Sequence, residues 1–301
     1  MHNCYTIGVD IGATKLEAGL VRNGRILKRI HLPTESLKHK GAIGIVANVR
    51  DAIRDVWDDK VAGIGIGVAG TTDPSRGYFY RGANFPRSFK ELSLASRFKN
   101  FKVPVAIDND VHCFALGEAL FGAGRDKGSI FGMTLGTGLG GALVVDGCIC
   151  GGRDNAAGEI GHTIISMSED SAICGCGLRG HLEAYVSGTG IARMIAERYR
   201  HPFPVEELSV RADDGDDKAA EIISVAGHAF AIGCANVVQT INPDIIIVGG
   251  GLSRMQGLWK VLQREFKGLI TYRQLRSTPV VKSDLGNDAN ILGGASLVCE
   301  C

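Results

Sequence analysis

The sequence lacks an excess of charge of either sign, a long apolar run and a secretion signal. Lys and Arg number 33 and Asp and Glu number 32, a formal net charge of +1. This balance argues against a broad basic face for DNA or for an anionic membrane. We expect no run of the roughly 18–20 apolar residues that span a bilayer. Residues 1–8 carry no basic segment followed by an apolar stretch. We therefore expect a cytoplasmic protein that binds neither membrane nor nucleic acid.

Cysteine and glycine, by contrast, are plentiful. Nine cysteines without a secretion signal are typical of thiols or metal ligands in a reducing compartment. Glycine accounts for 42 of the 301 residues, about twice its usual share. Hydrophobic residues at 45% and charged residues at 22% are ordinary for a folded protein. The length suits two domains of common size or one large domain.

One pattern of strands and glycine turns occurs twice along the chain. Each copy has a buried strand, a glycine-rich turn and a second strand, followed by a hairpin signal: Asn-Gly at 23–24 and Asp-Gly at 146–147. Aligning residues 6–26 with 130–149 matches these features, so we expect an internal duplication of structure. The predicted strands are 5–9, 16–21, 25–31, 61–68, 103–107, 130–135, 141–145, 245–248 and 280–281, and the predicted helices are 41–57, 92–98, 111–121, 181–199, 218–242, 255–266 and 289–297.

Three glycine-rich turns follow predicted strands, at 8–15, 134–141 and 249–251. Glycine lets the backbone approach a ligand and point N–H groups at phosphate oxygens. The P-loop spacing is absent, and the first two turns lead into strands, which excludes a Rossmann fingerprint. Two hairpin phosphate loops and a third glycine run favour a nucleotide held in a cleft between two lobes. The residues expected at the nucleotide are Gly8, Asp10, Gly12, Ala13, Thr14, Lys15, Thr134, Gly136, Thr137, Gly138, Gly140, Gly141, Gly250 and Gly251.

Carboxylates at two predicted strand ends provide candidate chemistry. Asp10, in the first glycine turn, suits Mg²⁺ held beside phosphates through water, and a turn cap is the alternative. Asp-Asn-Asp at 108–110 follows a strand and opens a helix, at the sheet edge where open α/β sheets bind ligands. There Asp110 can act as general base while Asn109 orients the substrate. Helix N-capping is the alternative, and both roles can coexist.

A cluster of His and Cys predicts a metal site. His162, Cys174, Cys176 and His181 lie within twenty residues, in a Cys-x-Cys-Gly-x-x-Gly-His run whose glycines allow tight turns. Sulfur and imidazole ligands suit tetrahedral Zn²⁺. Two unrelated cysteines on a surface loop are the alternative.

Two glutamates flank this cluster. Glu159 lies in Glu-Ile-Gly-His before it, and Glu183 follows in Gly-His-Leu-Glu. Carboxylates held beside a rigid metal knot are well placed to accept hydrogen bonds from sugar hydroxyls. Ordinary surface glutamates are the alternative reading.

Together these motifs resemble the ROK family (repressors, open reading frames and sugar kinases) of the hexokinase–Hsp70–actin superfamily, over residues 5–298. Residues 8–15 and 135–141 are similar to its two phosphate motifs, with Ala13 at a usual Gly position, and 248–251 to its adenosine motif. The resemblance implies two duplicated α/β lobes of the RNase H-like, actin-like ATPase type around a central nucleotide and sugar cleft. The implied lobes are a small one, residues 1–118 and 289–301, and a large one, residues 119–288.

The resemblance also implies a reaction, ATP-dependent phosphorylation of the 6-hydroxyl of a hexose, with Asp110 as catalytic base. Glucose is the first expectation, and an N-acetylglucosamine kinase, an N-acetylmannosamine kinase or a fructokinase are alternatives. The family's zinc motif normally has three cysteines, so His181 is a departure, and we expect a structural His₂Cys₂ zinc site. The implied partners are ATP, Mg²⁺, a sugar and a second copy of the chain. The implied sugar-binding residues are Asn84, Asn109, Asp110, Glu159, His162 and Glu183.

Three other functions are disfavoured. DNA-binding members of the family carry a helix-turn-helix before the first phosphate motif, whereas seven residues precede Gly8 here. A sugar sensor without activity does not need the intact Asp10, Asp110 and second glycine turn. A plain ATPase of the actin or Hsp70 kind does not need the Glu-Ile-Gly-His and zinc motifs.

Overall fold

The structure, a computed structural model, describes residues 4–12, 15–33, 41–83 and 85–299. The chain forms two compact units. Unit 1 comprises Met1–Gly132, Ala142–Ala157 and Ser283–Cys301, and unit 2 comprises Met133–Gly141 and Gly158–Lys282. Both contain helices and strands, so the predicted α/β class is confirmed. The predicted lobe boundaries stay a prediction.

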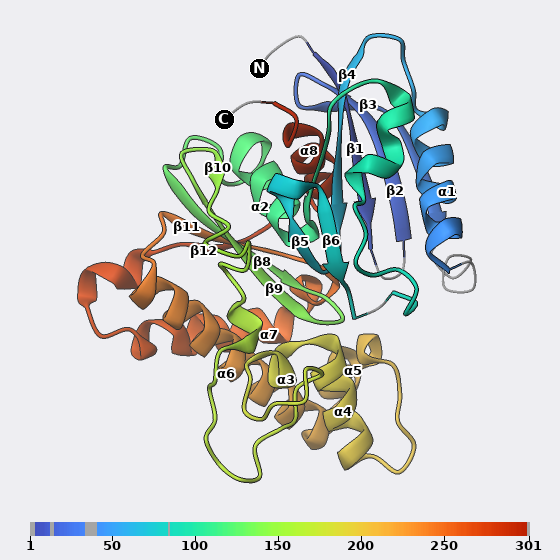
Figure 1. The fold of residues 1–301 in the computed structure, drawn as a ribbon. Coiled ribbons are helices and arrows are strands. Elements are labelled where there is room, and N and C mark those ends of the chain that lie inside the picture. Colours follow the sequence, from blue (N-terminus) through green and yellow to red (C-terminus); the bar gives the residue numbers. More distant parts are fainter. Residues whose placement is uncertain (1–3, 13–14, 34–40, 84, 300–301) are drawn as a thin grey trace. The chain divides into compact units, whose positions relative to one another are not determined.

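The first sheet has the strand order β3-β2-β1-β4-β7 (Figure 1). Asn23 and Gly24 take positive φ angles of 51° and 68°, so the Asn-Gly hairpin signal is confirmed. Strands β1 and β2 are antiparallel, while β1–β4 and β4–β7 are parallel. The strands are β1 (Tyr5–Ile11), β2 (Lys15–Arg22), β3 (Arg25–Pro33), β4 (Val61–Val68) and β7 (Val105–Asn109).

Helices cover both faces of this sheet. The helices are α1 (Gly41–Asp55), α2 (Asp110–Phe121) and α8 (Asp288–Ser296). Ile7, Val9 and Ile11 join a buried cluster with α1, and the alternate residues of β1 face the other way, toward α8. A Cβ at Gly8 would lie only 1.9 Å from the carbonyl oxygen of Ile291, so only glycine lets α8 pack this closely.

The second sheet has the order β10-β9-β8-β11-β12. Its order matches that of the first sheet strand for strand, so the predicted internal duplication is confirmed. The Asp-Gly signal at 146–147 again gives a turn with positive φ angles. The strands are β8 (Ser129–Leu135), β9 (Leu139–Val145), β10 (Cys148–Ile149), β11 (Ile245–Gly249) and β12 (Val280–Lys282).

Unit 2 contains five α-helices among its described residues, α3 (Glu183–Val186), α4 (Gly188–Arg198), α5 (Leu208–Asp213), α6 (Asp217–Thr240) and α7 (Gln256–Glu265). Helix α6 corrects one expectation, because an 18-residue window of it has a mean hydropathy of 1.5 and is long and apolar enough to cross a membrane. Because 67% of that window is buried within the fold, its apolar composition is that of a helix in the protein core.

Two predicted helices differ from the observed structure. The segment 181–199 is broken at Ser187, whose extended backbone (ψ 164°) ends α3 and whose hydroxyl caps α4 by accepting the Gly190 N–H. The segment 92–98 is a 3₁₀ helix, Ala95–Phe101, because Leu92 forms a β-bridge with Phe79. Strands β5 (Thr71–Asp73) and β6 (Tyr78–Arg81) and helix α5 were not predicted.

Candidate functional site

Two acidic residues lie at the carboxyl ends of the strands in unit 1. In strand register, Asp10 of β1 pairs with Gly67 of β4, which pairs with Asp108 of β7. Asp110 opens α2 directly after β7. The amide of Asn290 on α8 lies 3.4 Å from the Asp10 Oδ1 and 3.4 Å from the Asp110 carbonyl oxygen. The predicted magnesium carboxylate and the predicted base therefore share one sheet edge.

The environment of Asp10 disfavours its charge. The residue is 3% exposed, and burial, together with repulsion from Asp110, raises its pKa to about 7. Lys15, whose Nζ lies 3.8 Å from the Asp10 Oδ2, opposes this rise, and Glu17 adds to it. A cation at this edge would therefore be favoured, since it offsets two carboxylates in a partly dehydrated site.

Asn109 is the N-cap of α2. Its Oδ1 accepts hydrogen bonds from the backbone N–H groups of Val111 (2.7 Å) and His112 (3.3 Å). Its Nδ2 donates to the Gly70 carbonyl at 2.8 Å. The capping alternative is therefore confirmed for Asn109, and one amide hydrogen remains beyond these bonds for a substrate.

A buried polar network below Asn109 was missed at the sequence level. The Asp108 Oδ1 lies 2.8 Å from His112 Nδ1 and accepts bonds from Asn155 Nδ2 (2.8 Å) and from the Asn109 N–H (2.7 Å). Thr72 Oγ1 donates to the same oxygen at 3.4 Å. The four-residue spacing of Asp108 and His112 at a helix start is the one local signal, whereas Asn155 is 47 residues away in sequence.

In unit 2, the second and third glycine runs come together. Gly250 has φ +84°, and a Cβ there would lie 2.3 Å from the carbonyl oxygen of Leu135. The turn after Leu135 is closed by the Gly136 N–H donating to the Gly138 carbonyl at 3.0 Å. A Cβ at Gly136 or Gly251 would meet no atom within 4 Å. These two positions therefore offer open backbone of the kind that can approach phosphates.

The start of helix α4 supports this turn. The Gly188 N–H donates to the Gly136 carbonyl at 2.9 Å, and Thr189 donates to the Thr137 carbonyl through both its backbone N–H and its hydroxyl. The turn is thus held by a fixed element, which preorganises it for a ligand.

His162, Cys174, Cys176 and His181 form a compact cluster whose ligand atoms lie within 4.8 Å of one another. The two Nδ1 atoms are 3.4 Å apart, and the Cys176 and Cys174 sulfurs lie 3.3 and 3.8 Å from the nearest Nδ1. A tetrahedral zinc site with bonds of about 2.0–2.3 Å places its ligand atoms about 3.3–3.8 Å apart. The four residues therefore fit Zn²⁺ in chemistry, and these three distances fit the spacing of its ligands.

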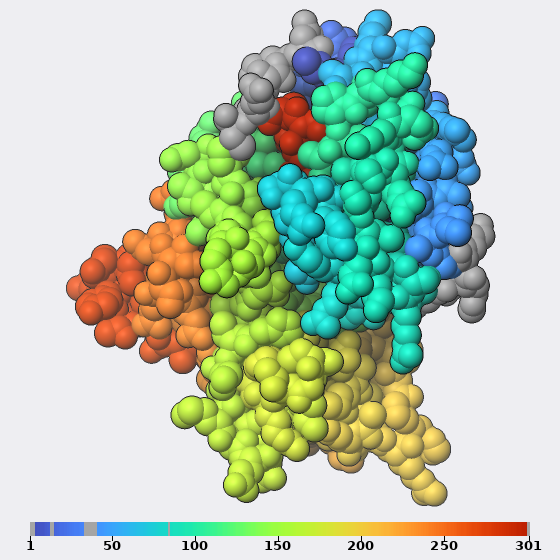
Figure 2. Space-filling model, in the orientation of Figure 1, coloured from blue at the N-terminus to red at the C-terminus, as the bar shows by residue number. Residues whose placement is uncertain are grey.

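The two flanking glutamates contact this cluster. Glu183 Oε1 accepts a hydrogen bond from the Cys174 thiol at 3.2 Å, and burial raises the pKa of that thiol to about 12. Glu159 Oε2 lies 4.0 Å from His162 Nε2. A carboxylate near the distal nitrogen of a metal-binding His orients the ring. The loop that carries the cluster lies at the surface (Figure 2), with Ile164, Met167, Ile173 and Leu178 exposed.

The remaining predicted residues divide into three groups. Ala13, Thr14 and Asn84 lie outside the described residues. Gly8 is buried in β1, where its contact with α8 explains the glycine. The others lie in or beside the glycine turns: Gly12, whose N–H donates to the Lys15 carbonyl at 2.9 Å, Thr134 on β8, and Gly140 and Gly141 on β9.

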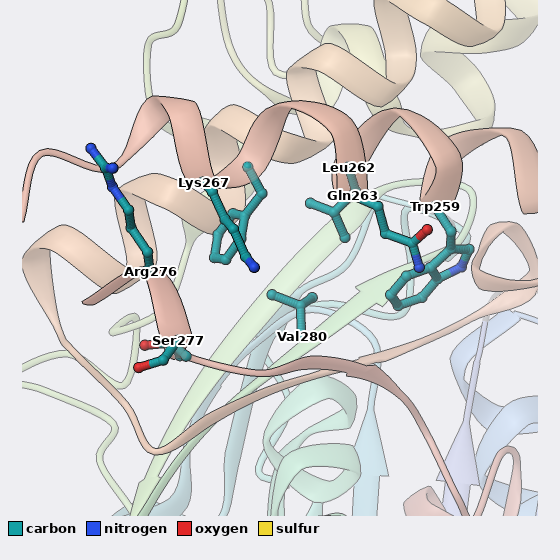
Figure 3. A pocket seen from close by; sticks show the side chains of 9 residues that line it. Trp259, Leu262, Gln263, Lys267, Arg276, Ser277 and Val280 are labelled. Carbon is teal, nitrogen blue, oxygen red and sulfur yellow. The ribbon is translucent and has the colours of Figure 1, made fainter. Parts of the chain in front are cut away.

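A cavity of about 360 Å³ lies elsewhere in unit 2, between α7 and β12 (Figure 3). Its lining includes Trp259 and Leu262 of α7, Val280 of β12, and Arg276 of the 3₁₀ helix Arg273–Ser277. None of the predicted site residues lines it, so the cavity is separate from the candidate site.

Comparisons with known proteins agree with this geometry. The family model described as ROK family matches residues 6–300. The glucokinase of Thermotoga maritima is 34% identical over 98% of this chain and 97% of its own length. The N-acetyl-D-glucosamine kinase of Yersinia pseudotuberculosis is 29% identical over 96% and 97%.

A solved structure shows the same fold. The ROK family glucokinase from Streptomyces griseus, in complex with glucose and AMPPNP, matches with a TM-score of 0.81 and 29% identity over 97% of this chain and 98% of that chain. The predicted fold class, duplicated α/β halves of the actin-like ATPase type, is confirmed by this match. Since one family model covers nearly the full length and a relative above 30% identity matches from end to end, the chain belongs to the ROK family.

Proposed function

We propose that the protein is an ATP-dependent kinase that phosphorylates the 6-hydroxyl of a hexose, with glucose as the first candidate. The observation that carries the proposal is that Asp10 and Asp110 lie at one sheet edge of unit 1, close enough for the Asp110 charge to raise the pKa of Asp10. Relatives named glucokinase and N-acetyl-D-glucosamine kinase support the same reaction class.

In this proposal Asp110 is the general base. Its carboxylate accepts the proton of the 6-hydroxyl as that oxygen bonds to the γ-phosphorus, and the bond from phosphorus to the leaving oxygen of ADP breaks. The remaining amide hydrogen of Asn109 orients the sugar. Asp10 would hold Mg²⁺, and this cation would supply charge stabilisation for the phosphates.

The open glycine backbone receives the nucleotide. Gly136 and Gly251 have no Cβ and face open space, so their backbone leaves room for the phosphate and adenosine groups. The Ala13 and Thr14 positions of the first phosphate motif complete the proposed set. Sugar binding then closes the proposed small lobe (residues 1–118 and 289–301) on the large lobe (119–288), which excludes water and suppresses ATP hydrolysis.

The proposed zinc is structural. His162, Cys174, Cys176 and His181 would fill all four positions of a tetrahedral ion, which leaves none for a substrate. Its role is to hold the loop from which Glu159 and Glu183 reach the sugar hydroxyls. A homodimer stays an expectation from the family.

A coupled ADP-release assay over a sugar panel tests the proposal. The panel contains glucose, N-acetylglucosamine, N-acetylmannosamine, fructose, mannose and allose, and the control is ATP without sugar. We expect glucose to give the highest kcat/KM. N-acetylglucosamine is the second candidate because of the Yersinia relative. ADP release that no sugar raises above the control would refute the kinase proposal.

A further inference from the structure

Asn155 is an inward-facing polar residue in a mostly exposed loop. Arg153 and Asp154 before it and Ala156 after it are exposed, whereas Asn155 is half-buried. Its backbone takes φ +56°, a left-handed conformation that Asn tolerates better than most residues. This conformation turns the side chain out of line with its exposed neighbours.

Both hydrogens of the Asn155 amide are accounted for. Nδ2 donates to Asp108 Oδ1 at 2.8 Å and to Thr72 Oγ1 at 3.0 Å. These acceptors lie on different strands, β7 and β5. One side chain thus joins the loop at 151–157 to buried residues of two strands of unit 1.

Asp108 depends on such donors. It is 4% exposed, and no Lys or Arg pairs with it among the described residues; His112 is its one ion-pair partner there. A buried carboxylate that loses a hydrogen-bond donor is left with part of its charge neither solvated nor paired, which is costly. The Asn155 amide is therefore part of what fixes the position of this carboxylate.

Asp108 in turn holds the proposed catalytic segment. Its Oδ1 accepts the backbone N–H of Asn109 at 2.7 Å and contacts His112, in the first turn of α2. Asn109 and Asp110 lie between these two contacts. A shift of the Asp108 carboxylate would move Asn109, the residue that orients the sugar in the proposed mechanism.

We propose that Asn155 is a positioning residue for the sugar. Its side chain connects the loop at 151–157 with the end of the strand that carries Asn109 and Asp110. Glu159 follows Asn155 by four residues along the chain. Asn155 does not touch the reacting atoms, and it acts through Asp108. The inference rests on the proposed kinase function and adds a residue that sets its sugar affinity.

The first test compares the effect of a substitution on the sugar KM with its effect on kcat. For Asn155→Ala we expect the KM for the preferred sugar to rise about tenfold, as expected for losing one bond to a charged group. The KM for ATP should stay within twofold and kcat within threefold. Asn155→Gln, which keeps the amide, should recover part of the sugar affinity. Asp154→Ala, an exposed neighbour, is the matched control and should behave as wild type.

The second test is the pH dependence of Asn155→Asp. Two carboxylates in contact repel, but one shared proton restores a hydrogen bond between them. We therefore expect the sugar KM, relative to wild type at the same pH, to be raised more at pH 8 than at pH 6. The surrounding titratable groups are present in both proteins, so dividing the KM of the variant by that of wild type at each pH isolates the effect of the added carboxylate. These groups are His112 and Cys113 on α2, Asp10 on β1 and Asp110.

Two outcomes separate the inference from the function on which it rests. Wild-type protein without sugar-dependent turnover refutes the kinase proposal and the inference with it. Normal wild-type turnover with a sugar KM within twofold of wild type in Asn155→Ala overturns the inference alone. Thermal unfolding of each variant checks the fold, and the Gln and Asp variants carry the test if the Ala variant is unstable.

Discussion

Glu183 accepts a hydrogen bond from the backbone N–H of Leu139 at 2.9 Å. The same carboxylate, through its other oxygen, accepts the thiol proton of Cys174. One side chain therefore links the proposed zinc cluster to the second glycine turn. A bound metal deprotonates a coordinating thiol, so we expect zinc to free the Glu183 Oε1 for a sugar hydroxyl.

The first prediction concerns zinc content. We expect about one equivalent of zinc per chain in the purified protein, because the four candidate ligand atoms already lie within 4.8 Å of one another. His181→Cys should keep the metal, since it restores the family's third cysteine, and Cys174→Ser should lower it below about half an equivalent. Elemental analysis measures this directly. Less than about half an equivalent in the wild-type protein would count against the site.

The second prediction concerns the base. Asp110→Asn keeps the shape of the side chain but cannot accept the sugar proton, so we expect kcat to fall by on the order of 10²–10⁴. Sugar binding, measured by calorimetry without ATP, should stay within a few-fold of wild type. Unchanged turnover would remove Asp110 from this role.

The third prediction concerns stability and pH. The pKa of Asp10 is about 7 in the folded state and near 3.8 when unfolded. Between these values the native state holds a proton that the unfolded state has released, so stability falls as the pH rises from about 4 to 7. At about 1.4 kcal/mol per pH unit, the contribution is roughly 4 kcal/mol.

Asp10→Asn should remove this contribution. The variant should unfold at a higher temperature than wild type at pH 8, and the two should converge toward pH 4, in thermal melts without nucleotide. A wild-type protein whose stability rises between pH 5 and 8 relative to the variant would contradict the assigned direction.

The fourth prediction contrasts two glycines. Gly8→Ala puts a methyl group against the carbonyl of Ile291, and we expect a loss of at least about 3 kcal/mol in the free energy of unfolding. Gly136→Ala meets no protein atom, so stability should change by less than about 1 kcal/mol while the KM for ATP rises. Denaturant unfolding and ATP titrations measure both. Equal destabilisation by both variants would contradict the open turn.

Much of the fold could be predicted because its signals are local. The two hairpins follow from Asn-Gly at 23–24 and Asp-Gly at 146–147. The break at Ser187 could not be predicted, because the apolar spacing continues through it. Helix α6 reads as a membrane span by composition, and only its burial identifies it as a core helix.

The candidate site was predicted only where its residues lie close together in the sequence. The four residues of the proposed zinc cluster lie within one short segment, so their spacing alone predicted the cluster that the structure brings together. The partners of Asp108 come from separate strands and from a loop 47 residues away, which no local pattern links. The capping role of Asn109 was foreseen only as one of two alternatives, since an N-cap and a substrate ligand use the same residue types.

Helix α8 has a consequence for how the chain folds during synthesis. Its backbone fills the glycine gaps at Gly8 and Gly65, so the first sheet is covered by a helix that begins about 280 residues after its first strand. While the ribosome makes the intervening segments, that face of the sheet is left without the helix that covers it. Closing so long a loop is slow, and we expect nascent chains shortened before Asp288 to expose this apolar face to chaperones and proteases.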